Sequence, residues 1–519
     1  MKHFNRFSLG LLLAGLLSSL MIFGCASRDV GNLSTVMEST GVPTILNRKL
    51  LAREYYGEEA GWFEERIPFF ECPDADLQQT YYFRWDVFRK HLKQTPDGFV
   101  VTEFTPPVSW AGKYNTISCA AGHHLYEGRW LRETNLVRDY ATFWFRKGGE
   151  PRKYSFWAAD AIYAAYRVQH ERDWVVDLLP DLINNFSGWE KTRRDDNGLF
   201  WQHDGQDGME VSIGGSGYRA TINSYMFGDA IAIMKIAELA GDKGTAARFR
   251  NDAAKIKQLT QSKLWDEEAA FFKVLPRGEG KSPADVRELH GYTPWYFNLP
   301  DARFSVAWTQ FMDPQGFYAP FGPTTAERRH PRFRFPHEQH CLWNGPSWPY
   351  STAVTLTAMA NLLNRYQQDY VTKQDYFEML QIYARSQRIT LPDGKVVPWI
   401  DENLDGETGE WITRKLLEKR GIKDRGKDYN HSSFCDLVIT GLVGLRPRAD
   451  NMIEVNPLVP EGTWDWFCLD RVPYHGRNLT ILWDKTGKKY GRGAGLRICV
   501  DGKKVASAPS LRRLTAKLR

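Results

Sequence analysis

Between about residues 75 and 445, apolar positions recur at the spacing of helix faces. One such face combines Phe156, Ala159, Ile162, Tyr163 and Tyr166, which are mostly three residues apart. This spacing brings side chains to one side of a helix. Three more stretches share this character: residues 222–237, 354–363 and 434–445. The pattern predicts a mainly α domain built from many helices.

Long loops rich in glycine, proline and aromatic residues separate these predicted helices. They cover residues 105–124, 195–217, 277–300, 313–349 and 391–411. Loops of this length within a compact domain are usually functional. Helices joined in this way suit a barrel of helical hairpins.

The pattern changes after Pro447, where alternating positions replace helical spacing. Residues 479–483 and 496–500 each predict a strand, and Asp501-Gly502 predicts a tight hairpin turn. We therefore expect a small β-sandwich over residues 448–519. Its basic tail after Ser510 is expected to be loosely held.

The first residues predict export. Lys2 and Arg6 lead into an apolar run over residues 7–23, as in a signal peptide. The ending at Cys25 resembles a bacterial lipobox, which implies a lipid on Cys25, cleavage before it and a membrane anchor in the periplasm or outer membrane. A plain signal peptide and a membrane anchor helix are the alternatives. Residues 25–74 then read as a polar tether and lead-in.

Composition narrows the class of protein. The 519 residues are 42% hydrophobic and 25% charged, which is globular and excludes a disordered or collagen-like chain. Aromatic residues reach 14%, enough to fill a core and to line a cleft that stacks sugar rings. Without Lys2 and Arg6 the net charge of +6 becomes +4, and no long basic run occurs, so nucleic acid is not an expected partner.

Four loop segments carry candidate chemistry. The turn from Trp343 to Pro349 is stiffened by glycine and proline and offers two indole faces; its alternative is an interhelical packing turn. A second segment places Glu210 on a glycine-rich loop before a helix, where acids are also common as helix caps. A third, residues 401–409, holds Glu402 among other acids; it lacks the spacing of a calcium loop, and a solvated turn is the alternative.

The fourth segment runs from Trp110 through two adjacent histidines to Glu127 and Arg129. Adjacent histidines point apart and make a poor metal pair, so we expect no metal ligands among them. Glu127 and Arg129 suit clamps on sugar hydroxyls, and a buried salt-bridge cluster is the alternative. No cofactor motif is found.

Together these segments resemble trehalases, processing α-glucosidases and mannosylglycerate hydrolases. The shared features are the Trp-Pro turn, the acid before a helix and the Glu402 segment, over roughly residues 75–445. The resemblance implies an (α/α)6 toroid, a six-hairpin glycosidase that works with inversion, with Glu210 as general acid and Glu402 as general base. Those enzymes mostly have Asp at the acid position, whereas rhamnosidase-like and maltose-phosphorylase-like families have Glu. Sugar identity is therefore not implied.

The sequence thus predicts an exo-acting glycoside hydrolase that cleaves terminal, α-linked sugars from oligosaccharides. We expect substrate contacts from eight residues: Trp85, Trp110, Glu127, Arg129, Trp343, Asn344, Trp348 and Trp399. The alternatives on the same toroid are a glycoside phosphorylase and a polysaccharide lyase, the latter relying on histidine, tyrosine or arginine. A surface glycan-binding lipoprotein without catalysis is the alternative outside the enzymes.

Overall fold

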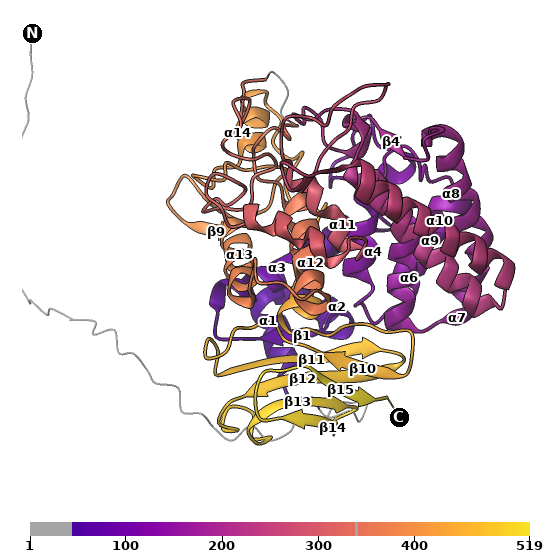
Figure 1. The fold of residues 1–519 in the computed structure, drawn as a ribbon. Helices are drawn as coiled ribbons and strands as arrows, with labels where there is room; N and C mark the ends of the chain where they lie inside the picture. Colours follow the sequence, from indigo (N-terminus) through magenta and orange to yellow (C-terminus); the bar gives the residue numbers. More distant parts are fainter. Residues whose placement is uncertain (1–43, 338–340, 519) are drawn as a thin grey trace, which may run out of the picture. The chain divides into compact units, whose positions relative to one another are not determined.

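The computed structural model describes residues 44–337 and 341–518, and helices dominate it (Figure 1). The helices are α1 Arg48–Tyr56, α2 Ala60–Arg66, α3 Ala75–His91, α4 Ala121–Gly128, α5 Asn135–Arg146, α6 Ala158–Gln169, α7 Arg172–Asp177, α8 Leu179–Arg193, α9 Ala220–Ala240, α10 Lys243–Lys263, α11 Thr293–Tyr296, α12 Pro349–Arg365, α13 Lys373–Ser386 and α14 Ile412–Lys419. The 3₁₀ segment η5 Ala302–Gln310 and the π-helical segment η6 Leu437–Leu442 complete the set used below.

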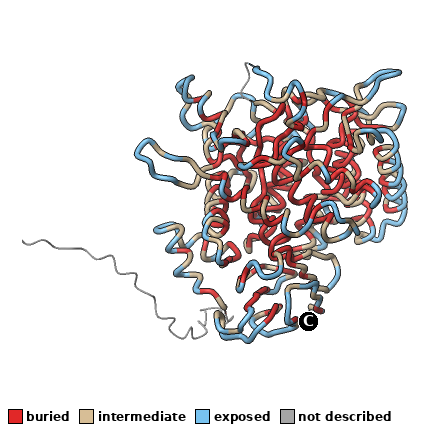
Figure 2. The backbone as a smooth tube through the Cα atoms, turned by 60° about the vertical axis from the view of Figure 1, so that its left-hand side comes forward, coloured by how far each residue is buried: buried red, intermediate tan, exposed pale blue. Residues whose placement is uncertain are grey.

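The helices form outer and inner pairs in chain order, as a six-hairpin toroid requires. In chain order the alternating outer and inner members are α3/α4, α5/α6, α8/α9, α10/α11, η5/α12 and α13/η6. The inner members contact one another in sequence: α4 with α6, α6 with α9, α9 with α11, α11 with α12, and α12 with η6. The inner members are buried along most of their length, and α9 and α12 are buried on nearly every side. A helix that is apolar all round belongs in a core, whereas α10 presents polar residues outward. Buried backbone accordingly concentrates at the centre of the helical domain (Figure 2).

Glu127 closes the ring of inner helices. Its carboxylate accepts the backbone N–H groups of Phe434, Cys435 and Asp436, just before η6. The first inner helix, α4, is thereby joined to the last, 307 residues further along the chain. The predicted (α/α)6 fold is confirmed.

The C-terminal strands form a small β domain, as predicted. A five-stranded antiparallel sheet has the order β1-β11-β12-β13-β14, and β10 pairs with β15. The strands are β1 Phe69–Glu71, β10 Met452–Val455, β11 Trp466–Tyr474, β12 Arg477–Asp484, β13 Gly495–Val500, β14 Lys503–Ala508 and β15 Leu514–Lys517. Asp501 and Gly502 both have positive φ in the β13–β14 turn, the geometry expected of a tight Asp-Gly hairpin.

Short two-stranded hairpins brace the loops between helices. They pair β2 Leu92–Thr95 with β3 Gly98–Val101, β4 Trp201–Gln202 with β5 Gly217–Tyr218, β6 Trp265–Asp266 with β7 Phe271–Phe272, and β8 Arg388–Thr390 with β9 Val396–Pro398. The β4–β5 pair closes the base of the loop that carries Glu210.

Both ends of the described chain are better ordered than the sequence suggests. The lead-in forms α1, α2 and β1, and β1 is the edge strand of the C-terminal sheet, paired with β11. The expectation of a loose tail after Ser510 is wrong, because β15 pairs with β10 over residues 514–517. Neither short strand has a strong local signal, since each gains its hydrogen bonds from a distant partner.

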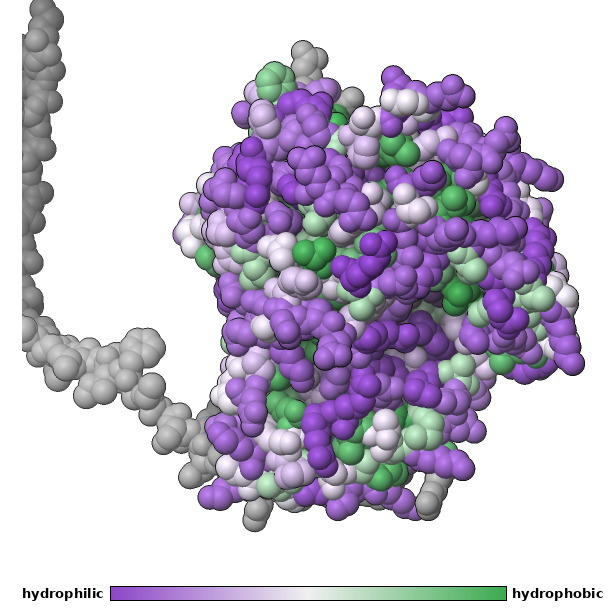
Figure 3. Space-filling model, in the orientation of Figure 1, coloured by the Kyte–Doolittle hydropathy of each residue, from purple (hydrophilic) through white to green (hydrophobic). Residues whose placement is uncertain are grey.

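Residues 1–43 lie outside the described residues, and so does the predicted lipid attachment at Cys25. Within the described part, none of the helices is both long enough and apolar enough to cross a bilayer. The face drawn in Figure 3 is mostly hydrophilic, with small scattered apolar areas.

Candidate active site

The turn from Trp343 to Pro349 links the two loops that carry the predicted catalytic acids. The backbone N–H of Trp343 donates to the carbonyl of Glu210 at 3.1 Å. Ser347 exchanges two backbone hydrogen bonds of 2.9 Å with Leu404, two residues after Glu402. Pro349 then begins α12, a position where its missing N–H costs nothing. One short segment therefore fixes both carboxylate loops against the start of an inner helix.

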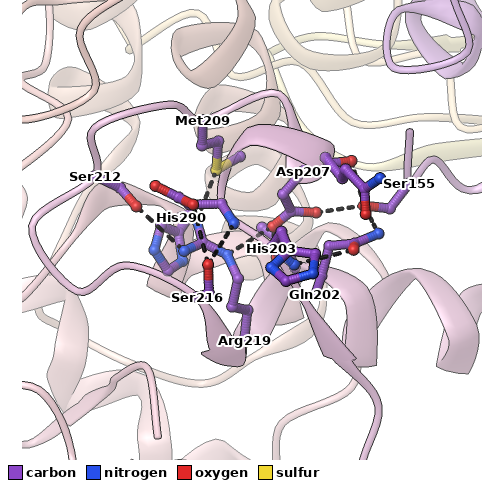
Figure 4. A network of polar contacts seen from close by, with 12 residues as sticks. Ser155, Gln202, His203, Asp207, Met209, Ser212, Ser216, Arg219 and His290 are labelled. Atoms are coloured by element: carbon purple, nitrogen blue, oxygen red, sulfur yellow. Dashed lines mark hydrogen bonds and ion pairs between the residues drawn. The ribbon is translucent and has the colours of Figure 1, made fainter. Parts of the chain in front are cut away.

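Arg219 holds the Glu210 loop from beneath. Its guanidinium pairs with Asp207 at 2.8 Å and also bonds Ser212 and Met209 (Figure 4). Asp207 additionally accepts from Ser155 at 2.5 Å, and both members of the ion pair are fully buried. Asp207 is therefore committed to the support of the loop.

Glu210 itself is half-buried and follows Met209 of this network directly in the chain. The thiol of Cys341 donates to its Oε2 at 3.2 Å. Burial raises the pKa of the Glu210 carboxyl, although the Cys341 hydrogen bond acts in the opposite direction. The next residue, Val211, has φ 64°, a conformation that costs a β-branched residue energy and marks a constrained loop.

Glu402 is more deeply buried, with 5% of its surface exposed. Behind it, Asp401 pairs with Arg414 at 2.8 Å and accepts the backbone N–H of Glu402. Burial raises the pKa of Glu402 to about 8, and the charge of Asp401 adds to the rise, while Arg425 opposes it. The charges of Glu103 and Glu210 raise it further, so the three carboxyl groups interact electrostatically.

Glu103 is a site residue that the sequence did not reveal. It is buried, accepts a hydrogen bond from the indole of Trp110 at 2.9 Å, and has its pKa raised to about 7 by burial. Its backbone N–H donates to Asn115 at 2.7 Å, which closes the loop around it. No spacing or motif marks this acid in the chain. Only the folding of its loop over the toroid brings it to Glu210 and Glu402.

The predicted aromatic contacts divide by exposure. Trp110 is 40% exposed and has Arg425 over its ring. Trp399 is half-buried with Arg414 and Lys427 over it. Trp343 and Trp348 stack on each other at 4.6 Å and are only 3% and 1% exposed. Trp110 therefore offers the largest free indole surface of the four.

Asn344, from the same turn, is buried. Its amide nitrogen donates to the carbonyl of Phe335 at 2.9 Å, while its side-chain oxygen has no hydrogen-bond partner among the described residues.

The structure does not bring Trp85, Glu127 or Arg129 to this site. Trp85 is fully buried in α3 against Tyr81 and Phe88. Glu127 closes the helix ring, and Arg129 pairs with Asp436 at 2.7 Å with 3% of its side chain exposed. These contacts match the buried salt-bridge cluster that the sequence left as the alternative.

The histidines of the lyase alternative are buried and uncharged. Burial lowers the pKa of His123 and His124 well below the usual value, and it lowers that of His431 to about 3. His124 is bonded on both ring nitrogens, to Tyr140 and to the carbonyl of Asn430.

The acids near Glu402 are paired with arginines. Asp405 pairs with Arg334 at 2.8 Å, and Glu407 pairs with Arg328. Within the described residues, no group of three or more His, Cys, Asp or Glu side chains is arranged to hold a metal ion.

The helix toroid with two carboxylate loops at one end is the architecture of the six-hairpin glycosidases. Residues 113–432 match the domain described as "Mannosylglycerate hydrolase MGH1-like glycoside hydrolase domain", and residues 445–507 match the C-terminal domain of glycosyl hydrolase family 65. The first match covers more than half of the chain. The chain therefore belongs to the MGH1-like glycoside hydrolase family.

Solved structures agree with this fold. A protein named sialidase is similar with a TM-score of 0.86 and 44% identity over 92% of this chain, which spans 45% of that protein's length. A GH78 rhamnosidase of Bacillus sp. GL1 has a TM-score of 0.54 at 13% identity, over 83% of this chain and 41% of its own. A GH63 mannosylglycerate hydrolase from Thermus thermophilus has a TM-score of 0.50 at 14% identity, over 69% of this chain and 99% of its own. The last two show the fold alone.

Proposed function

We propose that this glycosidase is exo-acting and inverting, and that it releases terminal, α-linked sugars with Glu210 as general acid and Glu402 as general base. The observation that carries the proposal is the Trp343–Pro349 turn, which is hydrogen-bonded to both acid loops. Inversion needs two carboxyl groups about 6.5–9.5 Å apart, with water on the far face of the sugar.

The raised pKa of Glu210 supports its role as the acid, whereas the raised pKa of Glu402 limits the pH range in which it can act as the base. Burial favours the neutral form of Glu210, which suits a group that protonates the glycosidic oxygen. Glu402, with a pKa of about 8, holds a proton at neutral pH in the ligand-free site, whereas a base must first lose it. The share of enzyme ready for inversion therefore grows as the pH rises towards 8.

The same pKa favours a second candidate in which the roles are exchanged. A carboxyl group that keeps its proton near neutral pH is well suited to act as the acid. In that case Glu210 would activate the water and Glu402 would protonate the leaving group.

The depth of the acid side chains below the surface supports an exo mode of attack. Glu402 is 5% exposed and Glu103 is 3% exposed, so the reacting end of the site lies below the surface. The end of a saccharide chain can enter such a site more readily than its middle. Trp110, 40% exposed, lies beside Glu103 and is available to stack on a sugar near the entrance.

The test is a panel of α-linked oligosaccharides, with product anomers read by NMR before they equilibrate. The panel includes mannosylglycerate, rhamnosides and sialosides, because proteins of those names share the fold. The proposal expects the first sugar released to have the opposite anomeric configuration. Retention at the anomeric carbon contradicts it.

Two variants assign the roles. The substrate that matters is a glycosyl fluoride, whose leaving group needs no protonation. Glu402→Gln should abolish turnover of all substrates, whereas Glu210→Gln should keep turnover of the fluoride; the opposite result establishes the exchanged roles. Glu418→Gln, an exposed acid on α14, is the matched control and should retain full activity. A glycan-binding protein without catalysis would keep its ligand in all three variants and turn over none of the panel.

The envelope location is a separate proposal. It rests on the basic start, the apolar run and Cys25 of the sequence. Labelled fatty acid should enter the wild-type chain and be absent from Cys25→Ala. Absence of label from both chains contradicts the proposal.

A further inference from the structure

A cavity of about 760 Å³ lies at the end of the toroid opposite to the proposed catalytic carboxylates, Glu210 and Glu402. Glu210 precedes α9 and Trp348 precedes α12, whereas the cavity is lined by Ile231 of α9 and Arg365 of α12. At a rise of 1.5 Å per residue these positions are about 16–24 Å along the helices from their first residues. The cavity is thus separate from the active site, although the same inner helices border both.

The lining of this cavity is strongly basic. It contains six arginines and three carboxylates, an excess of three formal positive charges. The arginines are Arg129, Arg167, Arg365, Arg446, Arg448 and Arg513. Three of them are neutralised within the fold: Arg129 by Asp436, Arg448 by Asp450 and Glu454, and Arg513 by Glu454.

The other three, Arg167, Arg365 and Arg446, form no ion pair with any carboxylate of the described residues. Arg446 bonds only neutral groups, the carbonyl of Thr440 and the side-chain oxygen of Asn361. Burial, and then the charges of Arg365 and Arg167, lower the pKa of Arg446 to about 10. Burial, and then the charge of Arg167, lower the pKa of Arg365 as well. Arg167 differs, because its interactions with Tyr126 and with Asp160 of the cavity wall outweigh burial and raise its pKa. Arg365 and Arg446 are therefore the guanidinium groups whose buried charge a bound anion would stabilise most.

Unsatisfied polar atoms border the same cavity. The hydroxyl of Tyr296, in a residue 5% exposed, has no hydrogen-bond partner among the described residues, and neither does the buried Nε of Arg167. Asn298 adds an unpartnered side-chain oxygen. Buried polar groups in native proteins are rarely left without partners, so several on one cavity indicate a ligand.

Capping of helix ends does not account for this cluster. Arg129, Arg446 and Arg513 do donate to backbone carbonyls, those of Ala164, Thr440 and Asn364. Arg167 and Arg365 donate to none within the described residues. Arg167 lies 5.6 Å from the centre of the Tyr163 ring and is attracted by the charge of Asp160, with which it forms no hydrogen bond among the described residues.

We propose that this cavity binds a phosphate or sulfate ester of a sugar-sized molecule, with the oxyanion held by Arg167, Arg365 and Arg446 and a hydrogen bond from the Tyr296 hydroxyl. Guanidinium forks match the oxygens of such groups. The volume lies within the range of small-molecule sites and exceeds what a bare oxyanion fills. The ligand is distinct from the substrate of the active site, because the cavity lies far from Glu210 and Glu402.

The test is calorimetry and thermal unfolding of the purified protein with four probes: glucose 6-phosphate, glucose 6-sulfate, inorganic phosphate and glucose, at constant ionic strength. A sugar ester should bind saturably and raise the Tm, and glucose should not. Binding of inorganic phosphate as tightly as the esters would identify a plain oxyanion site and overturn the sugar part of the proposal. If none of the four probes binds at 10 mM, the proposal of an oxyanion site in this cavity is overturned.

Arg167→Gln and Arg365→Gln should each weaken ester binding about tenfold or more. Arg365→Gln should not lower the Tm of the free protein, because it removes a charge that Arg167 repels. Arg167→Gln removes a charge that Asp160 attracts, so its test is the loss of ester binding. Arg303→Gln, which alters an exposed arginine outside the cavity, should bind as the wild type does. A loss of Tm in Arg365→Gln without ligand, or ester binding that both cavity variants leave unchanged, contradicts the proposal.

Discussion

At the scale of single residues, the proposed role of Glu402 as a base conflicts with stability, because the base must be ionised whereas burial favours the protonated carboxyl. Its pKa of about 8 in the folded protein is well above that of an unfolded glutamate, about 4.3. Between these pH values the folded state binds a proton that the unfolded state has lost. The stability that this protonation provides is complete below pH 4.3 and is lost as the pH rises to 8.

Glu402→Gln should therefore unfold at a higher temperature than the wild type at pH 8–9, with a gain on the order of a few kcal/mol. The gain should shrink towards pH 5, because the stability that protonation of Glu402 gives the folded wild type is restored as the pH falls towards 4.3. Thermal unfolding across this range measures it, and Glu418→Gln should show no such trend. An equal Tm difference at pH 5 and pH 9 would show that the burial of charge is not the cause.

Arg425 lowers the pKa of Glu402, so the direction in which its removal shifts that pKa can be predicted. In Arg425→Gln the pKa of Glu402 should rise further, and the limb of the kcat/KM profile that requires an ionised base should move to higher pH. The pH–rate profile of hydrolysis measures the shift. Lys419→Gln, an exposed cation on α14, should leave the profile unchanged. A shift towards lower pH would show that Glu402 is not the group that must ionise.

At the scale of elements, the Glu210 loop depends on one buried arginine. In Arg219→Met the carboxylate of Asp207 loses its partner, and breaking a buried pair in this way costs about 3–5 kcal/mol. We expect kcat to fall as well, because the loop loses its contacts from Ser212 and Met209 to the guanidinium. Urea unfolding and turnover measure the two effects.

The double variant Asp207→Asn/Arg219→Met separates position from stability. It removes the unpaired charge and should recover much of the free energy of unfolding, while kcat stays low because the loop remains unsupported. Full recovery of kcat together with stability would mean that Arg219 acts on folding alone.

Local patterns predicted the elements that depend on local physics. The inner helices α6, α9 and α12 follow from their apolar spacing, and the β13–β14 turn follows from Asp501-Gly502. Glu103 was not predictable, because its contact with the other acids depends on tertiary folding of its loop. Glu127 and Arg129 were assigned to substrate because a charged pair reads alike in sequence whether it meets a sugar or closes a ring of helices.

At the scale of the whole molecule, Asp470 holds the two ends of the described chain together. Its carboxylate accepts the backbone N–H groups of Ile45 and Leu46 at 2.8 and 3.0 Å, and the hydroxyl of Thr480 at 2.6 Å. The N-terminal lead-in is thereby attached to β11 of the C-terminal sheet.

Asp470→Ala should leave these N–H groups buried and unpaired, at a cost of about 1–3 kcal/mol each. Limited proteolysis should then cut faster near residues 45–46, where the lead-in has lost its attachment. Asp465→Ala, which alters an exposed acid of the same domain, is the control. Equal rates of cutting in the wild type and Asp470→Ala would contradict this role.

The pairing of β1 with β11 also imposes a delay on folding during synthesis, because the two strands are far apart in the chain. Phe69 lies opposite Asp470, so about 400 residues must be synthesised between the two strands, which takes on the order of 20–80 s at ~5–20 residues per second. During that interval Phe69 and Phe70, both buried in the finished protein, have no sheet to join. An unpaired apolar strand is an aggregation hazard, and it is long-lived here because its partner is made about 400 residues later. Chaperone demand during synthesis should therefore fall sharply once β11 has emerged.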